Sequence, residues 1–320
     1  MPLPLEWVKK IIDDDKKVYY FDYRLEKQHN YSALEAAQKN IEYIVNHFPK
    51  PYNLYLSGGI DSQAMLYAWH LSGQEYEAYS AKYNYDLNSN DLKALQSFAK
   101  IYNIKINYFD FDLINFLKEE HDFYANTYLT GSPQFTAFMK MASLKEDGTV
   151  IMSGNFLQTT NSEKNFSKNY LNYPCKNGIG LYHFARKTGK NFIPFFWLEQ
   201  PEVAYAFTEN EYVKQFYDLY GNISTMGTNV DPELSKLSPY VLKVALYQSH
   251  GFPVLRQPTK LNGFEEIKKF YDQYYEVPTE YDLFQKINKN YSNRVFDVLY
   301  RNKYEAKLKK VTYGVNVGLK

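Results

Sequence analysis

Small and polar residues stand together with one acid at positions 57–62, which read Ser-Gly-Gly-Ile-Asp-Ser. Gly58 and Gly59 let the backbone turn sharply, adopt positive φ and approach a ligand with no Cβ in the way. Ser57 and Ser62 add hydroxyl groups that donate hydrogen bonds. This combination predicts a loop that binds phosphate groups, and we call it the 57–62 loop.

The sequence on either side of the loop predicts a strand followed by a helix. Leu54, Tyr55 and Leu56 form a continuous apolar run, which is typical of a parallel strand buried on both faces. Residues 63–69 are good helix formers with apolar side chains on most faces. Because a helix N-terminus presents free N–H groups and the positive end of its dipole, it would stabilise an anion. An ordinary strand-to-helix turn, capped by a serine or an aspartate, is the alternative.

The acid in the loop indicates a metal ion. The Asp61 carboxylate would repel a bare phosphate, but Mg²⁺ binds one or two carboxylates together with phosphate oxygens and so could bridge the two. We therefore predict Asp61 as a metal ligand. The predicted phosphate-binding residues are Ser57, Gly58, Gly59, Ile60, Asp61 and Ser62. The loop lacks the Gly-Lys-Ser/Thr ending of a Walker loop.

Composition limits the class of protein. The chain has 320 residues, of which 45% are hydrophobic and 23% charged, and this fits a soluble globular protein with a sizeable core. Its 37 basic and 36 acidic residues leave a net charge of +1, so no global field attracts nucleic acid or a membrane surface. We find neither a signal peptide nor an apolar run that approaches the roughly 20 residues of a spanning helix, and we expect a cytoplasmic protein.

Cysteine chemistry is narrowly limited. Cys175 is the single cysteine, which excludes an intramolecular disulfide, a Cys-rich zinc site and any mechanism that needs two cysteines. The histidines are scattered without the spacing of metal ligands.

Alternating helix and strand patterns predict the fold class. Apolar residues at helical spacing predict helices over 32–48, where Ser32 and Glu35 form a capping box, and over 91–102. Further strands are predicted near 75–83, 104–109 and 149–152. This order is typical of an α/β fold with a doubly wound, mostly parallel sheet and right-handed crossovers.

The sequence also divides into candidate domains. We expect an N-terminal helical extension at 1–50, an α/β core at 51–160, and a mostly helical C-terminal region at 161–320 that completes the active site. The polar stretch 158–180 predicts a long surface loop.

Two other strand ends are expected at the ligand, because the carboxyl ends of the strands form the crevice of a doubly wound sheet. Ala81 and Lys82 end the strand 75–83, and we predict that they contact the adenine of a nucleotide. Ordinary strand packing explains these two residues almost as well. Gly154 and Asn155 follow the strand 149–152 and are predicted to line the same crevice.

The complete Ser-Gly-Gly-Ile-Asp-Ser string resembles the pyrophosphate loop (PP-loop) of the ATP pyrophosphatases. This superfamily has the adenine nucleotide alpha hydrolase-like fold and includes asparagine, GMP and NAD synthetases. Residues 193–207 are similar to the asparagine synthetase segment in which a proline-phenylalanine strand end precedes a helix. Residues 240–264 resemble that family's run of a basic helix, a proline and an Arg-x-Lys-x-Gly-Phe element. Across residues 31–275 the chain is therefore similar to the synthetase domain of asparagine and β-lactam synthetases.

The resemblance implies an ATP-dependent ligase that uses Mg²⁺. In that family a carboxylate attacks the α-phosphate of ATP, pyrophosphate leaves into the loop, and an amine or ammonia opens the acyl-adenylate. Lys260 corresponds to the family lysine that contacts phosphate or the intermediate, so Lys260 and Asp61 are the implied catalytic residues. The spacing from Arg256 to Lys260 is longer than in the family pattern, and a solvated loop lysine with an ion-paired arginine is the alternative.

The chain departs from the family in two places. Position 2 is proline and no amidotransferase domain fits before Tyr31, so we expect the nitrogen to come from free ammonia, a separate glutaminase or an amine substrate. The family motif Ser-Gly-Glu-Gly-x-Asp-Glu reads Ser-Gly-Asn-Phe-Leu-Gln-Thr at 153–159, without an acid. Either Glu163 or another acid replaces those carboxylates, or part of the activity is lost.

Three classes of function are therefore open. The first is the ligase, with a small-molecule carboxylate and an amine or ammonia as substrates. The second is a nucleotide-binding or assembly protein that keeps the loop without catalysis, which the missing acids favour. The third is a PP-loop enzyme that modifies a nucleobase or tRNA, although the near-neutral charge argues against stable nucleic acid binding.

Overall fold

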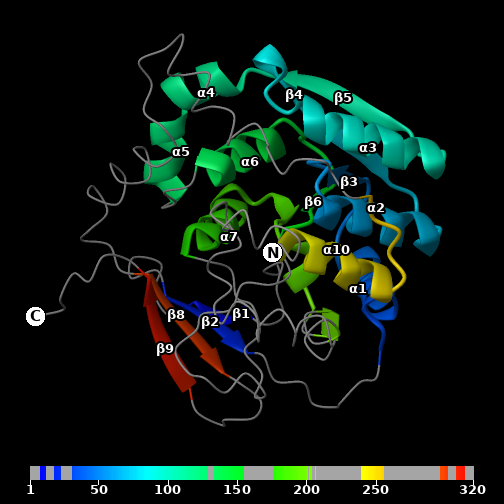
Figure 1. Cartoon of the computed structure of the whole chain (residues 1–320). Coiled ribbons are helices and arrows are strands. Elements are labelled where there is room, and N and C mark those ends of the chain that lie inside the picture. Colours follow the sequence, from blue (N-terminus) through cyan, green and yellow to red (C-terminus); the bar gives the residue numbers. More distant parts are fainter. Residues whose placement is uncertain are drawn as a thin grey trace, which may run out of the picture.

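The architecture is seen in a computed structural model of the chain (Figure 1). The structure describes residues 8–11, 18–22, 31–128, 133–154, 176–200, 202, 203, 206, 239–255, 296–301 and 308–313.

A five-stranded parallel sheet forms the centre of the protein, in the strand order β5-β4-β3-β6-β7 (Figure 1). Each pairing between neighbouring strands is parallel. The predicted α/β fold with a doubly wound parallel sheet is therefore confirmed. The strands are β3 (Tyr52–Tyr55), β4 (Glu77–Tyr83), β5 (Ile106–Phe111), β6 (Thr149–Met152) and β7 (Asn191–Ile193).

The order of the strands reverses next to β3. From β3 the chain first adds β4 and β5 on one side, and then crosses back to add β6 and β7 on the other. In open α/β sheets, ligands bind outside the carboxyl ends of the strands at such a switch point. The 57–62 loop follows β3, and Ser153 and Gly154 follow β6, so the winding of the sheet brings both segments to this place.

Helices cover both faces of the sheet (Figure 1). One face packs against α1 (Ala33–His47), α2 (Ile60–Ser72), α3 (Ser89–Ile101) and α10 (Pro239–Ser249). The other packs against α4 (Leu113–Glu119), α5 (His121–Tyr128), α6 (Pro133–Ser143) and α7 (Lys176–Thr188).

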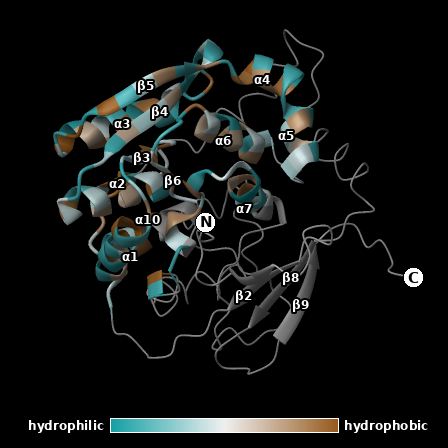
Figure 2. Ribbon diagram, turned by 180° about the vertical axis from the view of Figure 1, so that it is seen from behind, coloured by the Kyte–Doolittle hydropathy of each residue, from teal (hydrophilic) through white to brown (hydrophobic). Residues whose placement is uncertain are grey.

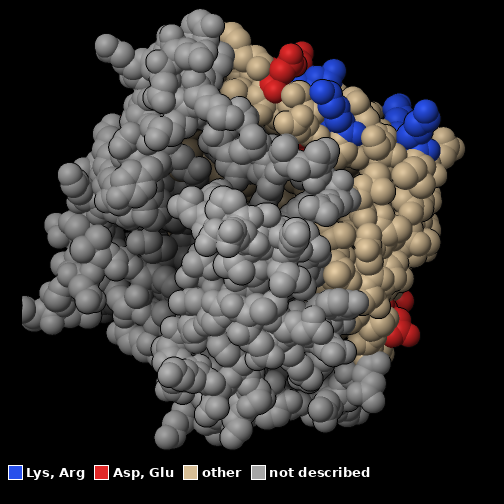
Figure 3. Space-filling model, viewed as in Figure 1, with Lys and Arg blue, Asp and Glu red and all other residues tan. Residues whose placement is uncertain are grey.

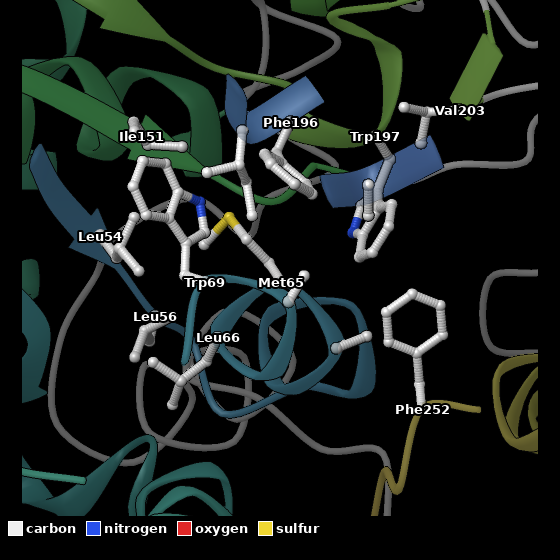
Figure 4. Close-up of a cluster of buried hydrophobic side chains, with 14 of the residues drawn as sticks. Leu54, Leu56, Met65, Leu66, Trp69, Ile151, Phe196, Trp197, Val203 and Phe252 are labelled. Atoms are coloured by element: carbon white, nitrogen blue, oxygen red, sulfur yellow. The ribbon is translucent and has the colours of Figure 1, made fainter. Parts of the chain in front are cut away.

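Successive side chains of the central strands point to opposite faces of the sheet and so contribute to two hydrophobic layers. Leu54 and Ile151 point into the layer of α1 and α2, while Tyr55 and Val150 point into the layer of α6 and α7. Figure 4 shows the first layer, in which side chains of β3 and α2 lie beside Ile151 and Phe196. Side chains of this size contribute about 2–3 kcal/mol each when fully buried. The layer holds α2, and with it the 57–62 loop, against the sheet.

Helix α1 begins where the sequence predicts. The Ser32 hydroxyl accepts the Glu35 N–H at 3.2 Å, and the Glu35 carboxylate accepts the Ser32 N–H at 2.8 Å. The predicted capping box is thus confirmed, and it holds the pKa of Glu35 below its usual value because the charged form accepts these bonds. In Figure 2 both hydrophobic and hydrophilic residues are visible around α1 and α3, as expected of helices with one buried face.

Part of the predicted organisation differs from the structure. Within 1–50, predicted as a helical extension, β1 (Val8–Ile11) and β2 (Val18–Asp22) are strands. They belong to a second sheet of order β1-β2-β8-β9, with β8 (Phe296–Arg301) and β9 (Leu308–Tyr313). β1 pairs with β2, and β8 pairs with β9, but the two pairs join only where β2 lies beside β8, almost the whole chain away in sequence. No local pattern identifies this sheet. The division into three domains stays a prediction.

The C-terminal region also contributes strands and a helix that local composition does not indicate. β7 lies beyond residue 160 and extends the core sheet. α7 begins at Lys176, inside the stretch 158–180 that was predicted as a loop. Leu181 and Phe184 of α7 are buried in the layer of α5 and α6, so tertiary packing overrides the helix-breaking glycines of this stretch. None of the described helices is long and apolar enough to cross a membrane.

Candidate functional site

Gly58 brings the 57–62 loop into direct contact with α3. Its φ is +91°, a conformation that L side chains rarely adopt. A Cβ at this position would lie 2.2 Å from the backbone oxygen of Asp91, in the first turn of α3. Only glycine fits here, and the contact fixes where the loop runs relative to its neighbouring helix.

Helix α2 begins at the loop without a side-chain cap. Gly59 is the N-cap residue, with extended backbone angles and no side-chain hydrogen bond. The first backbone hydrogen bond of the helix runs from the Gln63 N–H to the Gly59 oxygen at 3.0 Å. A helix that begins in this way directs the N–H groups of its first turn and its positive dipole end toward an anion.

The two loop serines have different positions. The Ser62 hydroxyl is buried, donates to the Gly59 oxygen at 2.8 Å and accepts the Gly58 N–H at 3.1 Å. The Ser57 hydroxyl accepts the Gly59 N–H at 3.3 Å and belongs to an exposed residue. Ser62 therefore braces the turn from inside, and its hydroxyl lies 3.4 Å from that of Ser57. A contact of either serine with phosphate stays a prediction.

Gln63 ties the loop to the segment after α10. Its buried carboxamide donates from Nε2 to the Gly58 oxygen at 2.9 Å and accepts the Leu255 N–H at Oε1 at 2.8 Å. Gln63 is not among the residues predicted from the sequence to form the site. The sequence feature that could have indicated its role is a polar residue directly before the apolar run 64–66. A glutamine at such a place is expected to be buried, and a buried amide must find hydrogen-bond partners.

Asp61 contacts two aromatic residues from distant parts of the chain. The Tyr247 hydroxyl of α10 donates to Asp61 Oδ1 at 2.6 Å, and the Trp197 Nε1–H donates to the Asp61 backbone oxygen at 3.2 Å. Tyr247 is fully buried. Burial is the main cause that raises the pKa of the Tyr247 hydroxyl well above its usual value, and the nearby negative charge of Asp61 is the second. The Tyr247 hydroxyl thus stays protonated and acts as a donor. No sequence signal predicts either partner.

The described residues do not form a cluster of metal-binding side chains around Asp61. Among them, no group of three or more His, Cys, Asp and Glu side chains could hold a metal ion. Asp61 Oδ1 also accepts a hydrogen bond from Tyr247, so this oxygen is already engaged. The role of Asp61 as a Mg²⁺ ligand stays a prediction.

The predicted adenine residues lie on β4, next to the strand that leads into the loop. Ala81 is buried, and its backbone oxygen accepts the Asn88 Nδ2–H at 2.8 Å. Lys82 is exposed, with Nζ 5.1 Å from the centre of the Tyr108 ring. A role for these residues in binding adenine stays a prediction.

The end of β6 packs against the turn after β7. Gly154 has a φ of +63°, and a Cβ there would lie 2.4 Å from Phe195 Cδ1. The Trp197 N–H donates to the Ser153 oxygen at 3.3 Å. Gly154 therefore has a packing role, and its predicted contact with a ligand stays a prediction. Asn155 and Lys260 lie outside the described residues.

Basic and acidic side chains stand apart on the described part of the face that Figure 3 shows. On the face in Figure 3, the tan area carries separate basic and acidic side chains and no continuous basic surface. This agrees with the net charge of +1.

No protein-family model and no curated protein sequence matches this chain. Among solved structures, the chain is similar to the NMN synthetase from Francisella tularensis, with 15% sequence identity, 83% of this chain and 96% of that chain covered, and a TM-score of 0.32. A likeness of this degree carries no conclusion about function. The fold assignment rests on the strand order and the parallel pairing described above.

Proposed function

We propose that this protein is an ATP-dependent ligase of the PP-loop type, which binds the pyrophosphate part of ATP at the 57–62 loop and adenylates a carboxylate. One observation carries the proposal. The Ser-Gly-Gly-Ile-Asp-Ser string forms the uncapped N-terminus of α2 at the switch point of a doubly wound sheet.

The loop has features that suit a pyrophosphate group. The tight turn at Gly58 and the absence of a side chain at Gly59 let backbone N–H groups approach a ligand closely. α1 provides a contrast within the same chain, because its N-terminus is closed by the Ser32 and Glu35 side chains. An anion at α2 would take the place that a capping side chain has in α1.

The proposed reaction has two steps. A carboxylate oxygen attacks the α-phosphorus of ATP, the bond to the bridging oxygen breaks, and pyrophosphate leaves into the loop. An amine or ammonia nitrogen then attacks the acyl carbon, AMP leaves with the bonding electrons, and the nitrogen releases a proton to solvent. Negative charge grows on the departing groups, so fixed donors in the loop would stabilise the transition state. When bound, Mg²⁺ would neutralise phosphate charge, and Asp61 is the residue that we propose to hold it.

The other proposed participants come from the sequence. Lys260 would contact phosphate or the intermediate, Ala81 and Lys82 would contact adenine, and Gly154 and Asn155 would line the crevice. A partner glutaminase, free ammonia or an amine substrate would supply the nitrogen.

Pyrophosphate release tests this function. Wild-type protein is incubated with ATP, Mg²⁺ and a panel of amino acids and other small carboxylates, and pyrophosphate is measured. We expect release that depends on one carboxylate and falls at least tenfold in Asp61→Ala, whereas Asp122→Ala, which removes an exposed acid of α5, retains it. Release that is independent of the carboxylate, or equal in wild type and Asp61→Ala, would contradict the proposal.

A second function is favoured by the surroundings of Asp61. The bond from Tyr247 engages Asp61 Oδ1, and the described residues contain no larger group of metal ligands. Both observations suit a protein that binds a nucleotide without turning it over. Calorimetry that shows tight ATP or AMP binding, together with no pyrophosphate release for any carboxylate, would select this function over the ligase.

A further inference from the structure

Two elements far apart in sequence converge on the acid of the 57–62 loop. Tyr247 of α10 donates to the Asp61 side chain, and Trp197, after β7, donates to the Asp61 backbone. The Trp197 and Tyr247 rings lie 5.6 Å apart, and each lies 5.6 Å from the ring of Phe252. Figure 4 shows Trp197 and Phe252 beside α2.

We propose that Tyr247 is a positioning residue, which holds the Asp61 carboxylate toward the buried layer between α2 and α10 and so keeps it off the N–H groups in the first turn of α2, where an anion would bind. Tyr247, Trp197 and Phe252 are fully buried. The hydroxyl is therefore fixed by its packed ring and cannot follow the carboxylate to another position. At 2.6 Å the contact has the length of a charge-assisted bond.

The need for such a residue follows from electrostatics. A carboxylate in the first turn of a helix is attracted to the same N–H groups and dipole end that would bind a phosphate. It would also repel a phosphate that carries the same sign of charge. The Tyr247 hydroxyl gives the carboxylate another partner and keeps it off these N–H groups, and Mg²⁺, when bound, would join the carboxylate to the phosphates. The proposal rests on the proposed function for the identity of the anion, but the Tyr247–Asp61 pair can be tested without it.

The test is calorimetry with inorganic pyrophosphate in the absence of Mg²⁺. We expect Tyr247→Phe to weaken binding by about tenfold to a hundredfold, the effect of one hydrogen bond to a charged group. Asp61→Ala should bind at least as tightly as wild type, and adding Tyr247→Phe to Asp61→Ala should cause no further loss. The control is Tyr52→Phe, because the Tyr52 hydroxyl is also buried but donates to the Val45 and Phe48 oxygens. It should bind as wild type does.

Two results would overturn the proposal: wild-type affinity in Tyr247→Phe, or a loss that persists in full in the Asp61→Ala background. If wild type binds no pyrophosphate, the proposed function fails. Urea unfolding of wild type, Tyr247→Phe, Asp61→Ala and the double variant then tests the contact between Tyr247 and Asp61. If Tyr247→Phe shifts the unfolding midpoint less in the Asp61→Ala background than in wild type, the result supports the proposed interaction between Tyr247 and Asp61. Equal shifts would refute it, since independent residues give additive effects.

Discussion

At the scale of single residues, the 57–62 loop is held by its neighbours in space. Gly58 lies against the backbone of Asp91, Ser62 closes the turn from inside, and Gln63 bridges the loop and Leu255. These contacts give the loop one shape before any ligand arrives. A loop that is ordered in advance loses less conformational entropy on binding, which favours affinity.

Gly58→Ala is predicted to be strongly destabilising. The new Cβ would meet the Asp91 oxygen at 2.2 Å, and the residue would keep a φ of +91°, so we expect a loss of about 3 kcal/mol in the free energy of unfolding. Gly73→Ala is the matched control, because Gly73 has a φ of +67° but nothing within 4 Å of its Cβ position. It should cost only about 1 kcal/mol. Urea unfolding of both variants measures this, and equal losses would show that the contact with Asp91 is unimportant.

Residue types in the loop are predictable from sequence, whereas their partners are not. The glycines, serines and acid at 57–62 are read directly, and the structure places them at the end of a buried strand, as predicted. Tyr247 and Trp197 act on Asp61 across 186 and 136 residues. Such pairs depend on how α10 and the turn after β7 pack, and one sequence contains no pattern that encodes this.

At the scale of elements, α10 connects the start of α1 with the 57–62 loop. His250 Nδ1, just after α10, accepts the Ala33 N–H of the first turn of α1 at 3.3 Å. Burial lowers the pKa of His250, because a partly buried imidazole is less stable when charged. Tyr247 lies on the same helix, so the docking of α10 on α1 also positions the hydroxyl that holds Asp61.

His250 is predicted to make stability depend on pH. Its folded pKa lies below the unfolded value of about 6.5, so the unfolded chain takes up the proton first and the folded state loses stability as the pH falls below that value. Above the unfolded pKa the contribution is fully present. His250→Asn keeps a side-chain acceptor but cannot titrate, and it should show a smaller loss of unfolding free energy between pH 7 and pH 5. Identical pH profiles for the two proteins would contradict this role.

Element types in the core follow from local patterns. The apolar runs and alternation place β3, β4, β5 and β6 within a few residues of their observed positions, and the capping box marks the start of α1. β7 is only three residues long, and α7 contains two glycines within its first turns. Packing against the sheet and against α6 stabilises these elements, and local propensity does not reveal it.

At the scale of the whole molecule, the winding of the sheet positions the candidate site. β3 and β6 lie side by side because the chain reverses its direction of winding after β5. The 57–62 loop and Ser153 are thereby brought to one edge, and Trp197 bonds to Asp61 and to Ser153. The net charge of +1 means that any attraction for an anion must come from this local arrangement.

Pyrophosphate is therefore predicted to stabilise the whole protein. A ligand that binds the folded state adds about 2.7 kcal/mol of stability at a free concentration one hundred times its Kd. We expect the thermal midpoint to rise with pyrophosphate concentration. Well above the Kd, it should keep rising in proportion to the logarithm of that concentration. Sodium chloride at matched ionic strength is the control, and an equal rise in chloride would mean that general screening of charge causes the effect.

A crystal structure of the protein with ATP and Mg²⁺ tests the central claim most directly, because it locates the phosphates. We predict that the β- and γ-phosphate oxygens lie within hydrogen-bond distance of backbone N–H groups of the 57–62 loop, at the carboxyl end of β3, with the Asp61 side chain still bonded to Tyr247. A nucleotide bound elsewhere on the protein, or no bound nucleotide at saturating concentration, would contradict the assignment of the loop as the phosphate site.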